Sequence, residues 1–291
     1  MSDAATAFEP HRRYLVGLAY RMLGSVAEAE DVVQDAFLRW QTRGDDVVAT
    51  PRAFLSRIVT RLCLDRLKSA RAQREQYVGT WLPEPMIDHA SDHAPRADEA
   101  MALADDLSVA LLVTLERLSP LERAAFLLHD VFDMEFDAVA DVLERSEAAV
   151  RQLAARARDH VRDERPRFTP ASDAPSRLAD AFHRAAAQGD LAAISQLLAE
   201  DAVFYSDGGG KRRAALNPIY GRAKILRFIV GIAKRGGLAP PSALQRATIN
   251  GLPGFIVHGA EGVETLALEI SGEHIVAIYA IRNPDKLRHV E

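Results

Sequence analysis

Cysteine is nearly absent from this sequence, since Cys63 is the only one in 291 residues. An intrachain disulfide is therefore impossible, and the cysteine usage gives no sign of an oxidising compartment. Long apolar runs are absent too, because no stretch approaches the roughly 18 residues that a membrane helix needs. The N-terminus lacks the apolar segment of a signal peptide. We therefore expect a cytoplasmic protein with no membrane partner, in which Cys63 is a small core residue.

The chain also lacks an excess of positive charge, because its formal net charge is -5. This balance excludes a protein that coats nucleic acid along its whole length. Positive residues nevertheless predominate between 51 and 74, and acidic residues between 84 and 106. Local fields of this kind decide where a nucleic acid binds. The length and the 48% of hydrophobic residues predict several domains, each with a core of its own.

Residues 134–161 have the pattern of two helices joined by a tight turn. Apolar residues recur at helical spacing in 136–143 and again in 150–161, and Ser146 is a favoured N-cap for the second helix. The opposite face of that helix carries basic, amide and small side chains: Arg151, Gln152, Ala155 and Arg156, with Arg158 on a flank. Such side chains suit a DNA major groove, where Arg reads guanine, Gln reads adenine and Ala contacts a thymine methyl. The alternative is a surface motif whose charges interact only with solvent.

Three further helices are predicted near the N-terminus, at 8–23, at 28–41 and from Pro51 to about residue 70. The second has an exposed face that is acidic at its start, and a loop at 42–50 follows it. The third is amphipathic and strongly basic. A basic helix behind a loop suits contact with the phosphates of an opened DNA strand. Taken alone, the face of the second helix is more typical of a solvated surface than of a docking site, and the alternative for the third is a surface helix that is basic without a DNA role.

Several segments together resemble the extracytoplasmic-function (ECF) RNA polymerase sigma factors. Glu28–Leu38, Pro51–Leu55 and Leu64–Lys68 resemble region two of that family, and Pro120–Leu128 with the helix-turn-helix after it resembles region four. The resemblance implies two all-α domains, at 1–70 and 107–165. One departure lies in the turn, where many relatives have glycine at the position of Glu144. If this position needs a positive φ, a glutamate there is strained.

The resemblance also implies a role for each surface. Four residues of the second helix would bind the clamp helices of core RNA polymerase: Asp31, Gln34, Asp35 and Leu38. The loop at 41–50 would hold a flipped base of the −10 promoter element, while Arg52, Arg57 and Arg61 would guide the separated strands. The helix that carries Arg151 would read the −35 element. Trapping a base in this way offsets the few kcal/mol that unstacking costs.

The remaining chain is predicted to be two linkers and an α+β domain. Residues 71–106 are acidic and aperiodic, and 166–175 form a second linker. From 176 to 291, helices at 176–188, 191–198 and 223–234 precede antiparallel strands at 247–249, 255–257, 263–270 and 275–281. His89 and His93 in the first linker have no cysteine or regular helix nearby, so we predict no metal site and no cofactor.

This last domain resembles the SnoaL-like (NTF2-like) cone-shaped α+β fold. Three motifs resemble those of the ECF subgroup that carries such a domain at its C-terminus: Trp81, Leu82, Pro83, Glu84 and Pro85 in the linker, then Asp207, Gly208, Gly209, Gly210 and Lys211, then Asn283, Pro284, Asp285, Lys286 and Leu287. The subgroup implies a regulatory domain that holds the linker and replaces a separate anti-sigma factor. The expected whole is therefore two all-α sigma domains followed by a SnoaL-like domain.

Alternatives remain for this domain and for the whole chain. The glycines beside Asp207 are compatible with a phosphate cradle, but the P-loop spacing is lacking and a tight turn is favoured. Related folds isomerise or cyclise ketones, yet the polar candidates form no convincing acid–base pair, so we expect no enzyme: Asp207, Glu264, Glu269, Tyr205 and His258. A pocket for a small molecule remains compatible with the fold. A one-component, ligand-responsive regulator of transcription would leave residues 28–68 without a role.

Overall fold

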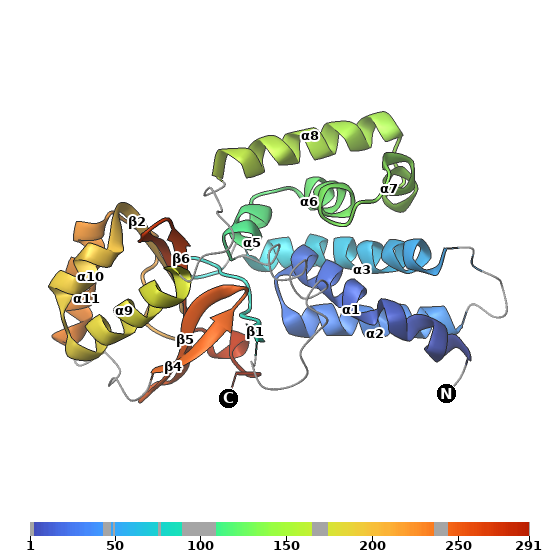
Figure 1. Cartoon of the computed structure of the whole chain (residues 1–291). Helices are drawn as coiled ribbons and strands as arrows, with labels where there is room; N and C mark the ends of the chain where they lie inside the picture. Colours follow the sequence, from blue (N-terminus) through green and yellow to red (C-terminus); the bar gives the residue numbers. More distant parts are fainter. Residues whose placement is uncertain are drawn as a thin grey trace. The chain divides into compact units, whose positions relative to one another are not determined.

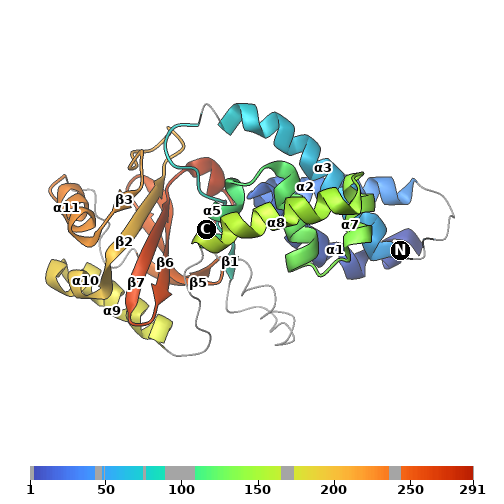
Figure 2. The same cartoon turned by 90° about the horizontal axis from the view of Figure 1, so that it is seen from above.

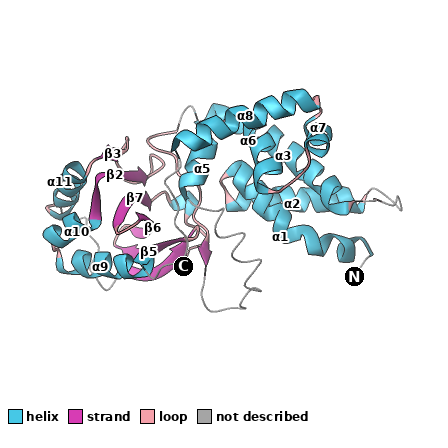
Figure 3. Ribbon diagram, turned by 45° about the horizontal axis from the view of Figure 1, so that its top comes forward, coloured by secondary structure: helices cyan, strands magenta, loops and turns pink. Residues whose placement is uncertain are grey.

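The chain divides into two compact units. The computed structural model describes residues 3–42, 48, 50–74, 77–88, 109–164, 174–235 and 244–290. Unit 1 comprises residues 1–75 and 111–165, and unit 2 comprises residues 76–110 and 166–291. Unit 1 is helical, whereas unit 2 combines helices with strands (Figure 3). The linker segment that follows the third helix therefore belongs with the C-terminal domain.

Three long helices form the first part of unit 1 (Figure 1): α1 (Asp3–Leu23), α2 (Val26–Gln41) and α3 (Pro51–Arg74). Gly24, with φ 70°, turns the chain after α1, and the Ser25 hydroxyl accepts a hydrogen bond from the Glu28 amide to cap α2. Cys63 is fully buried in α3, as predicted, and burial raises the pKa of its thiol. The third helix continues past residue 70 because Lys68–Arg74 contains strong helix formers.

The second part of unit 1 contains the predicted helix-turn-helix. It consists of α5 (Val109–Glu116), α6 (Pro120–Phe126), the π-helical turn η1 (Leu127–Val131), α7 (Phe136–Leu143) and α8 (Glu147–Glu164). Ser119 and Glu122 form a capping box at the start of α6. Between α7 and α8, Glu144 adopts the left-handed conformation with φ 53°, so the strained turn expected there is present.

Unit 2 is built on one mixed sheet. Its described strands are β1 (Ile87–Asp88), β2 (Leu198–Asp207), β3 (Ile219–Tyr220), β4 (Leu244–Ile249), β5 (Leu252–Gly259), β6 (Gly262–Ser271) and β7 (His274–Ile281), in the order β1-β4-β5-β6-β7-β2-β3. The helices α9 (Ala174–Gln188), α10 (Leu191–Leu197) and α11 (Arg222–Ala233) lie on one side of the sheet (Figure 2). A short 3-10 helix, η3 (Pro284–Lys286), follows the last strand. The α+β domain is thus confirmed.

One pairing of this sheet differs from the expected antiparallel arrangement, and one strand lies outside the residues expected to form the domain. β2 was not predicted, and it pairs parallel to β7. β1 lies in the segment expected to be an extended linker, and it pairs antiparallel with β4 through Ile87 and Asp88. Part of the linker is therefore a structural strand of the C-terminal domain. Within the described residues, no helix is long and apolar enough to cross a membrane.

Candidate nucleic-acid interface and linker clamp

The outer face of α8 presents the predicted DNA-reading side chains together. Val150, Leu153, Ala157 and Val161 are buried, as their helical spacing predicted. Four of the five predicted reading residues are exposed and the fifth is half-buried: Arg151, Gln152, Ala155 and Arg156, then Arg158. α8 therefore separates an apolar inner face from a basic and amide outer face, which is the arrangement that a recognition helix needs.

Neighbouring groups hold the arginines of this face in place. The Arg151 guanidinium lies 4.3 Å from the centre of the Phe136 ring and pairs with Glu147. The Arg156 Nε donates to Glu122 Oε1 at 2.7 Å. Burial works against ionisation of Glu122, but hydrogen bonds from Ser119 and Arg156 outweigh it and lower the pKa of this carboxyl. The Arg151–Glu147 pair is exposed, and exposed ion pairs contribute little stability, so a phosphate could replace that carboxylate at small cost.

The predicted polymerase-binding residues also share one face, on α2. Asp31, Gln34 and Leu38 are exposed, and Asp35 is half-buried. The Leu38 side chain is 49% exposed, so this face carries one large apolar side chain at the surface. Arg66 of α3 lies 3.6 Å from a carboxylate oxygen of both Asp31 and Asp35. The face combines acidic groups with one exposed apolar side chain, a composition suited to a protein interface.

Two of the three arginines predicted to guide the DNA strands are paired with a carboxylate of the helix-turn-helix. Glu144 Oε1 lies 3.8 Å from Arg57 Nη2 and forms a closer ion pair with Arg61. Arg52 instead stacks on the Tyr14 ring, at 4.0 Å from its centre. In this conformation the Glu144 carboxylate neutralises Arg57 and Arg61, the two groups predicted to contact the strands. The loop expected to hold a flipped base lies almost entirely outside the described residues.

Arg123 of α6 is a buried contact that the sequence reasoning missed. It is 2% exposed, and its Nη1 donates to the Met22 carbonyl of α1 and to Glu116 Oε1, each at 2.7 Å. The contact joins the region-two helices to the region-four helices within unit 1. The available signal was the position of this arginine between Leu121 and the apolar run Ala124–Leu128. A charge on the apolar side of a helix needs a buried partner.

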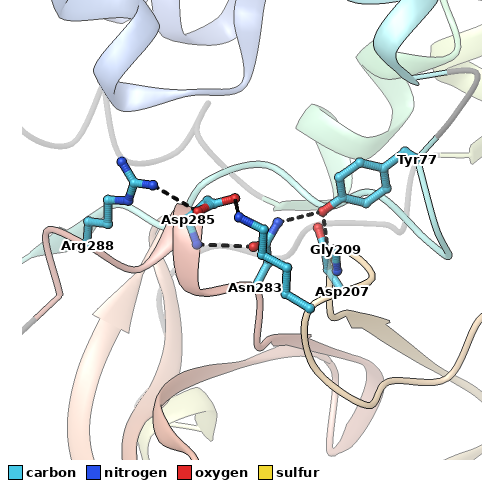
Figure 4. Close-up of polar contacts among 7 residues, drawn as sticks. Tyr77, Asp207, Gly209, Asn283, Asp285 and Arg288 are labelled. Carbon is cyan, nitrogen blue, oxygen red and sulfur yellow. Dashed lines mark hydrogen bonds and ion pairs between the residues drawn. The ribbon is translucent and has the colours of Figure 1, made fainter.

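In unit 2, Asp207 binds the linker segment through both carboxylate oxygens. Its Oδ1 accepts from the Tyr77 hydroxyl at 2.5 Å, and its Oδ2 accepts from the Leu82 amide at 2.8 Å. Lys286 Nζ lies 2.7 Å from Oδ2, and Asp207 itself is fully buried. The Tyr77 hydroxyl also accepts from Asn283 Nδ2 at 2.9 Å (Figure 4). We call these five residues the linker clamp.

Burial and charge make the linker clamp a well-defined contact. Burial, together with the hydrogen bond to Asp207, raises the pKa of Tyr77, so the phenol remains a proton donor. The Lys286 ammonium lies 4.0 Å from the centre of the Trp81 ring, which gives that tryptophan a cation–π partner. A buried carboxylate is stable only when it is paired and hydrogen-bonded, and these contacts satisfy both conditions.

The three sequence motifs therefore meet at one place. Trp81 and Leu82 come from the first motif, Asp207 from the second, and Asn283 and Lys286 from the third. Further along the linker, His289 Nε2 lies 2.7 Å from the Pro85 carbonyl and its Nδ1 lies 3.2 Å from Glu84.

The glycines of the second motif allow a tight turn and a close contact with the Asn283 side chain. Gly209 and Gly210 have positive φ, and a Cβ on Gly209 would collide with the Asn283 side chain. Lys211 pairs with Asp285 at the surface. These contacts account for the motif without a phosphate.

A cavity of about 310 Å³ lies between the sheet and the helices of unit 2. Its wall is mainly apolar and includes Phe182, Ile194, Phe204, Phe228 and Ile232. Of the polar candidates from the sequence, only Glu264 lines it, and Glu264 is ion-paired with Arg282.

The other polar candidates have different surroundings. Asp207 belongs to the linker clamp, His258 is exposed, and Tyr205 stacks on the Tyr279 ring at 5.2 Å. Glu269 accepts a hydrogen bond from the Tyr279 hydroxyl at 2.6 Å. The described lining residues thus contain no acid–base pair other than the neutralised Glu264 and Arg282. His89 and His93 lie outside the described residues, and within those residues no cluster of three metal-ligating side chains occurs.

Both helical parts of unit 1 match models of known protein families. Residues 7–73 match the family model for Sigma-70 region 2, and residues 108–161 match that for Sigma-70 region 4. The chain thus has both region 2 and region 4 of a sigma factor. A one-component regulator is not favoured, because residues 28–68 fall within region 2.

Whole-chain comparisons narrow the class further. The chain is 41% identical to the ECF RNA polymerase sigma factor SigJ of Mycobacterium tuberculosis, over 96% of this chain and 91% of SigJ. It is 36% identical over 199 residues to the probable ECF sigma factor SigI of the same species, covering 67% of this chain and 66% of SigI. The crystal structure of the M. tuberculosis SigJ aligns with a TM-score of 0.81 and 38% identity, covering 97% of this chain and 98% of that one. The chain belongs to the ECF RNA polymerase sigma factor family.

Proposed function

We propose that this sigma factor directs core RNA polymerase to its promoters through three surfaces of unit 1. The exposed face of α2 binds the polymerase clamp helices through Asp31, Gln34, Asp35 and Leu38. The outer face of α8 reads the −35 element, and the arginines of α3 contact the −10 region. The observation that carries the proposal is the segregation of α8 into a buried apolar face and an exposed face with Arg151 and Gln152.

The pairing of Glu144 with Arg57 and Arg61 supports a closed state of unit 1. Arginines that are neutralised by a carboxylate attract DNA phosphates less strongly. We therefore infer that region two and region four separate before the −10 strands are bound. In that open state the carboxylate of Glu144 no longer lies beside the arginines.

We further infer that the C-terminal domain controls activity by holding the linker, without a separate anti-sigma factor. The linker clamp supports this inference, because it fixes Tyr77 and Leu82 directly downstream of α3. The length of free linker limits how far region two and region four can separate. A domain that retains or releases this segment therefore sets that length.

A pull-down with purified core RNA polymerase tests the α2 surface. Asp35→Arg reverses a charge on the exposed face, so we expect at least a tenfold loss of polymerase binding. Glu30→Arg, on the same helix but outside the predicted set, is the matched control and should bind as the unaltered chain does. Equal binding of both variants would remove α2 from the interface.

A further inference from the structure

The cavity of unit 2 contains a buried hydroxyl without a protein partner. Ser206 on β2 lines the cavity and is 2% exposed. No hydrogen bond of its hydroxyl is found within the described residues, and Thr265, a second hydroxyl residue of the lining, is 1% exposed and likewise has no hydrogen-bond partner there. A buried hydroxyl that lacks a partner costs free energy, so such groups in native proteins usually meet a water or a ligand.

The rest of the cavity has the composition of a small-molecule site. Aromatic and aliphatic side chains form most of the wall, including Phe204 and Phe228, whose ring centres are 5.3 Å apart. Polar groups occur at one end, where Ser206, Glu264 and Arg282 lie near the ends of adjacent strands. Glu264 and Arg282 neutralise each other, and the other charged residue of the described lining, Lys234, is exposed at the surface, so the buried polar end presents no uncompensated charge. Its volume of about 310 Å³ lies at the lower end of the range for ligand pockets.

Two pairs of consecutive residues connect this cavity to the linker clamp. Side chains alternate between the two faces of a strand, so Ser206 faces the cavity whereas Asp207 faces the linker. At the end of β7, Arg282 lines the cavity and Asn283 donates to Tyr77. The amides of Arg282 and Asn283 both donate to the Asp207 carbonyl, at 2.7 and 3.0 Å. A shift of β2 or β7 on the cavity side therefore moves the groups that hold the linker.

We propose that this cavity binds an uncharged, largely apolar ring molecule whose single hydroxyl or carbonyl pairs with Ser206, and that its binding alters the linker clamp. This proposal extends the proposed control by the C-terminal domain, and an effect of the ligand on transcription depends on that control. Binding itself is independent of polymerase and DNA. The apolar body contacts the helix-side wall, and the polar group satisfies the Ser206 hydroxyl.

Binding of the fluorescent probe N-phenyl-1-naphthylamine to the full chain tests the cavity. We expect saturable binding to one site. Ala186→Phe fills the cavity from α9 and should reduce this binding at least tenfold. Ala187→Phe, which alters a neighbouring alanine outside the lining, is the matched control and should leave it unchanged. Absence of saturable binding, or equal binding by both variants, would overturn the proposal.

Displacement of the probe by 2-naphthol and by naphthalene tests the polar end. Because one hydrogen bond contributes a modest net free energy, 2-naphthol should bind about two- to tenfold more tightly than naphthalene. Ser206→Ala should abolish this difference while leaving naphthalene binding intact. A difference that persists in Ser206→Ala would overturn the role of this hydroxyl.

Hydrogen–deuterium exchange at the Leu82 amide tests the coupling, because that amide donates to Asp207. Saturating 2-naphthol should change its exchange rate at least threefold in the unaltered chain and leave it unchanged in Ala186→Phe. An unchanged rate in the unaltered chain would overturn the coupling. These experiments use neither polymerase nor DNA, so their failure is distinct from a failure to initiate transcription.

Discussion

At the scale of single residues, the outer face of α8 offers the most direct test of DNA reading. Arg151 is exposed, and only a surface ion pair with Glu147 and the Phe136 ring hold it in place. We expect Arg151→Ala to weaken promoter binding by about 1–3 kcal/mol and to reduce selectivity at the −35 element. Binding of the polymerase–sigma complex to promoter DNA with intact or altered −35 bases measures both effects.

The matched control for this substitution is Arg184→Ala, which removes an exposed arginine from α9 in unit 2. Its promoter affinity should equal that of the unaltered protein. If Arg151→Ala kept its full preference for the −35 bases, the placement of α8 in the major groove would be wrong.

Glu269 provides a residue-scale prediction about pH. Burial raises the pKa of this carboxyl above its ordinary value of 4.5, although the Tyr279 hydroxyl opposes the shift. Its ionised form is therefore less stable in the folded domain than in the unfolded chain. The free energy of unfolding should fall as the pH rises from 4.5 through the raised pKa.

Glu269→Gln keeps an acceptor for Tyr279 but removes the ionisation, so it should raise the thermal stability of unit 2 at about pH 8. The gain should shrink as the pH falls through 4.5, because below that pH the wild-type carboxyl is protonated in both states. Glu273→Gln, at an exposed position, should show no such trend. Thermal unfolding across this pH range would contradict the account if the Glu269→Gln gain were constant.

At the scale of elements, the contact between α3 and the turn before α8 predicts a gain of function. Glu144 pairs with Arg57 and Arg61, so Glu144→Gln should free both arginines for DNA phosphates. We expect a two- to tenfold increase in affinity for a single-stranded −10 oligonucleotide at low salt, with the difference decreasing as salt rises. Fluorescence anisotropy with a labelled oligonucleotide measures this affinity.

Glu147→Gln is the control, because Glu147 pairs with Arg151 of its own helix rather than with Arg57 or Arg61. It should leave the affinity for the −10 oligonucleotide unchanged. If Glu144→Gln bound no more tightly than this control, Glu144 would not shield the arginines of α3.

The sequence predicted the helices better than the strands because the two kinds of signal differ in length. α8 has an apolar face, a cap at Ser146 and a basic face over 18 residues, so both the helix and its proposed role in DNA binding could be predicted from the sequence. β2 begins with Leu198-Ala-Glu-Asp, where the alternation is interrupted, and its parallel partner β7 lies some 70 residues away. The short strand β1 derives from pairing with β4 rather than from its own sequence.

The candidate site shows the same division. The motif residues Trp81, Asp207 and Lys286 were identified by resemblance. That Lys286 contacts both the Trp81 ring and the Asp207 carboxylate depends on the tertiary structure and could not be predicted from the sequence. Tyr77 was missed because it precedes the linker motif and has no pattern of its own. The unpartnered hydroxyl of Ser206 has no signature in the sequence either, since its significance depends on the cavity that it lines.

At the scale of the whole molecule, the linker clamp holds the segment that follows α3 in the C-terminal domain. Asp207 is fully buried and accepts from Tyr77, Leu82 and Lys286. Asp207→Asn removes the charge and one acceptor, and hydrogen bonds to charged groups contribute about 1.5–3 kcal/mol. We expect amide exchange at Leu82 to accelerate at least tenfold.

Asp201→Asn, at an exposed position on the same strand, is the matched control and should exchange at Leu82 as the unaltered chain does. Equal exchange in the two variants would show that Asp207 does not hold the linker. Circular dichroism of both variants would separate release of the linker from loss of the fold.

The most direct test of the central claim is transcription from genomic DNA fragments by purified core RNA polymerase with and without this chain. The account predicts discrete start sites that require the chain and that are lost when Asp35→Arg replaces it. Identical transcripts with and without the chain, on every fragment, would contradict its assignment as a promoter-directing sigma factor.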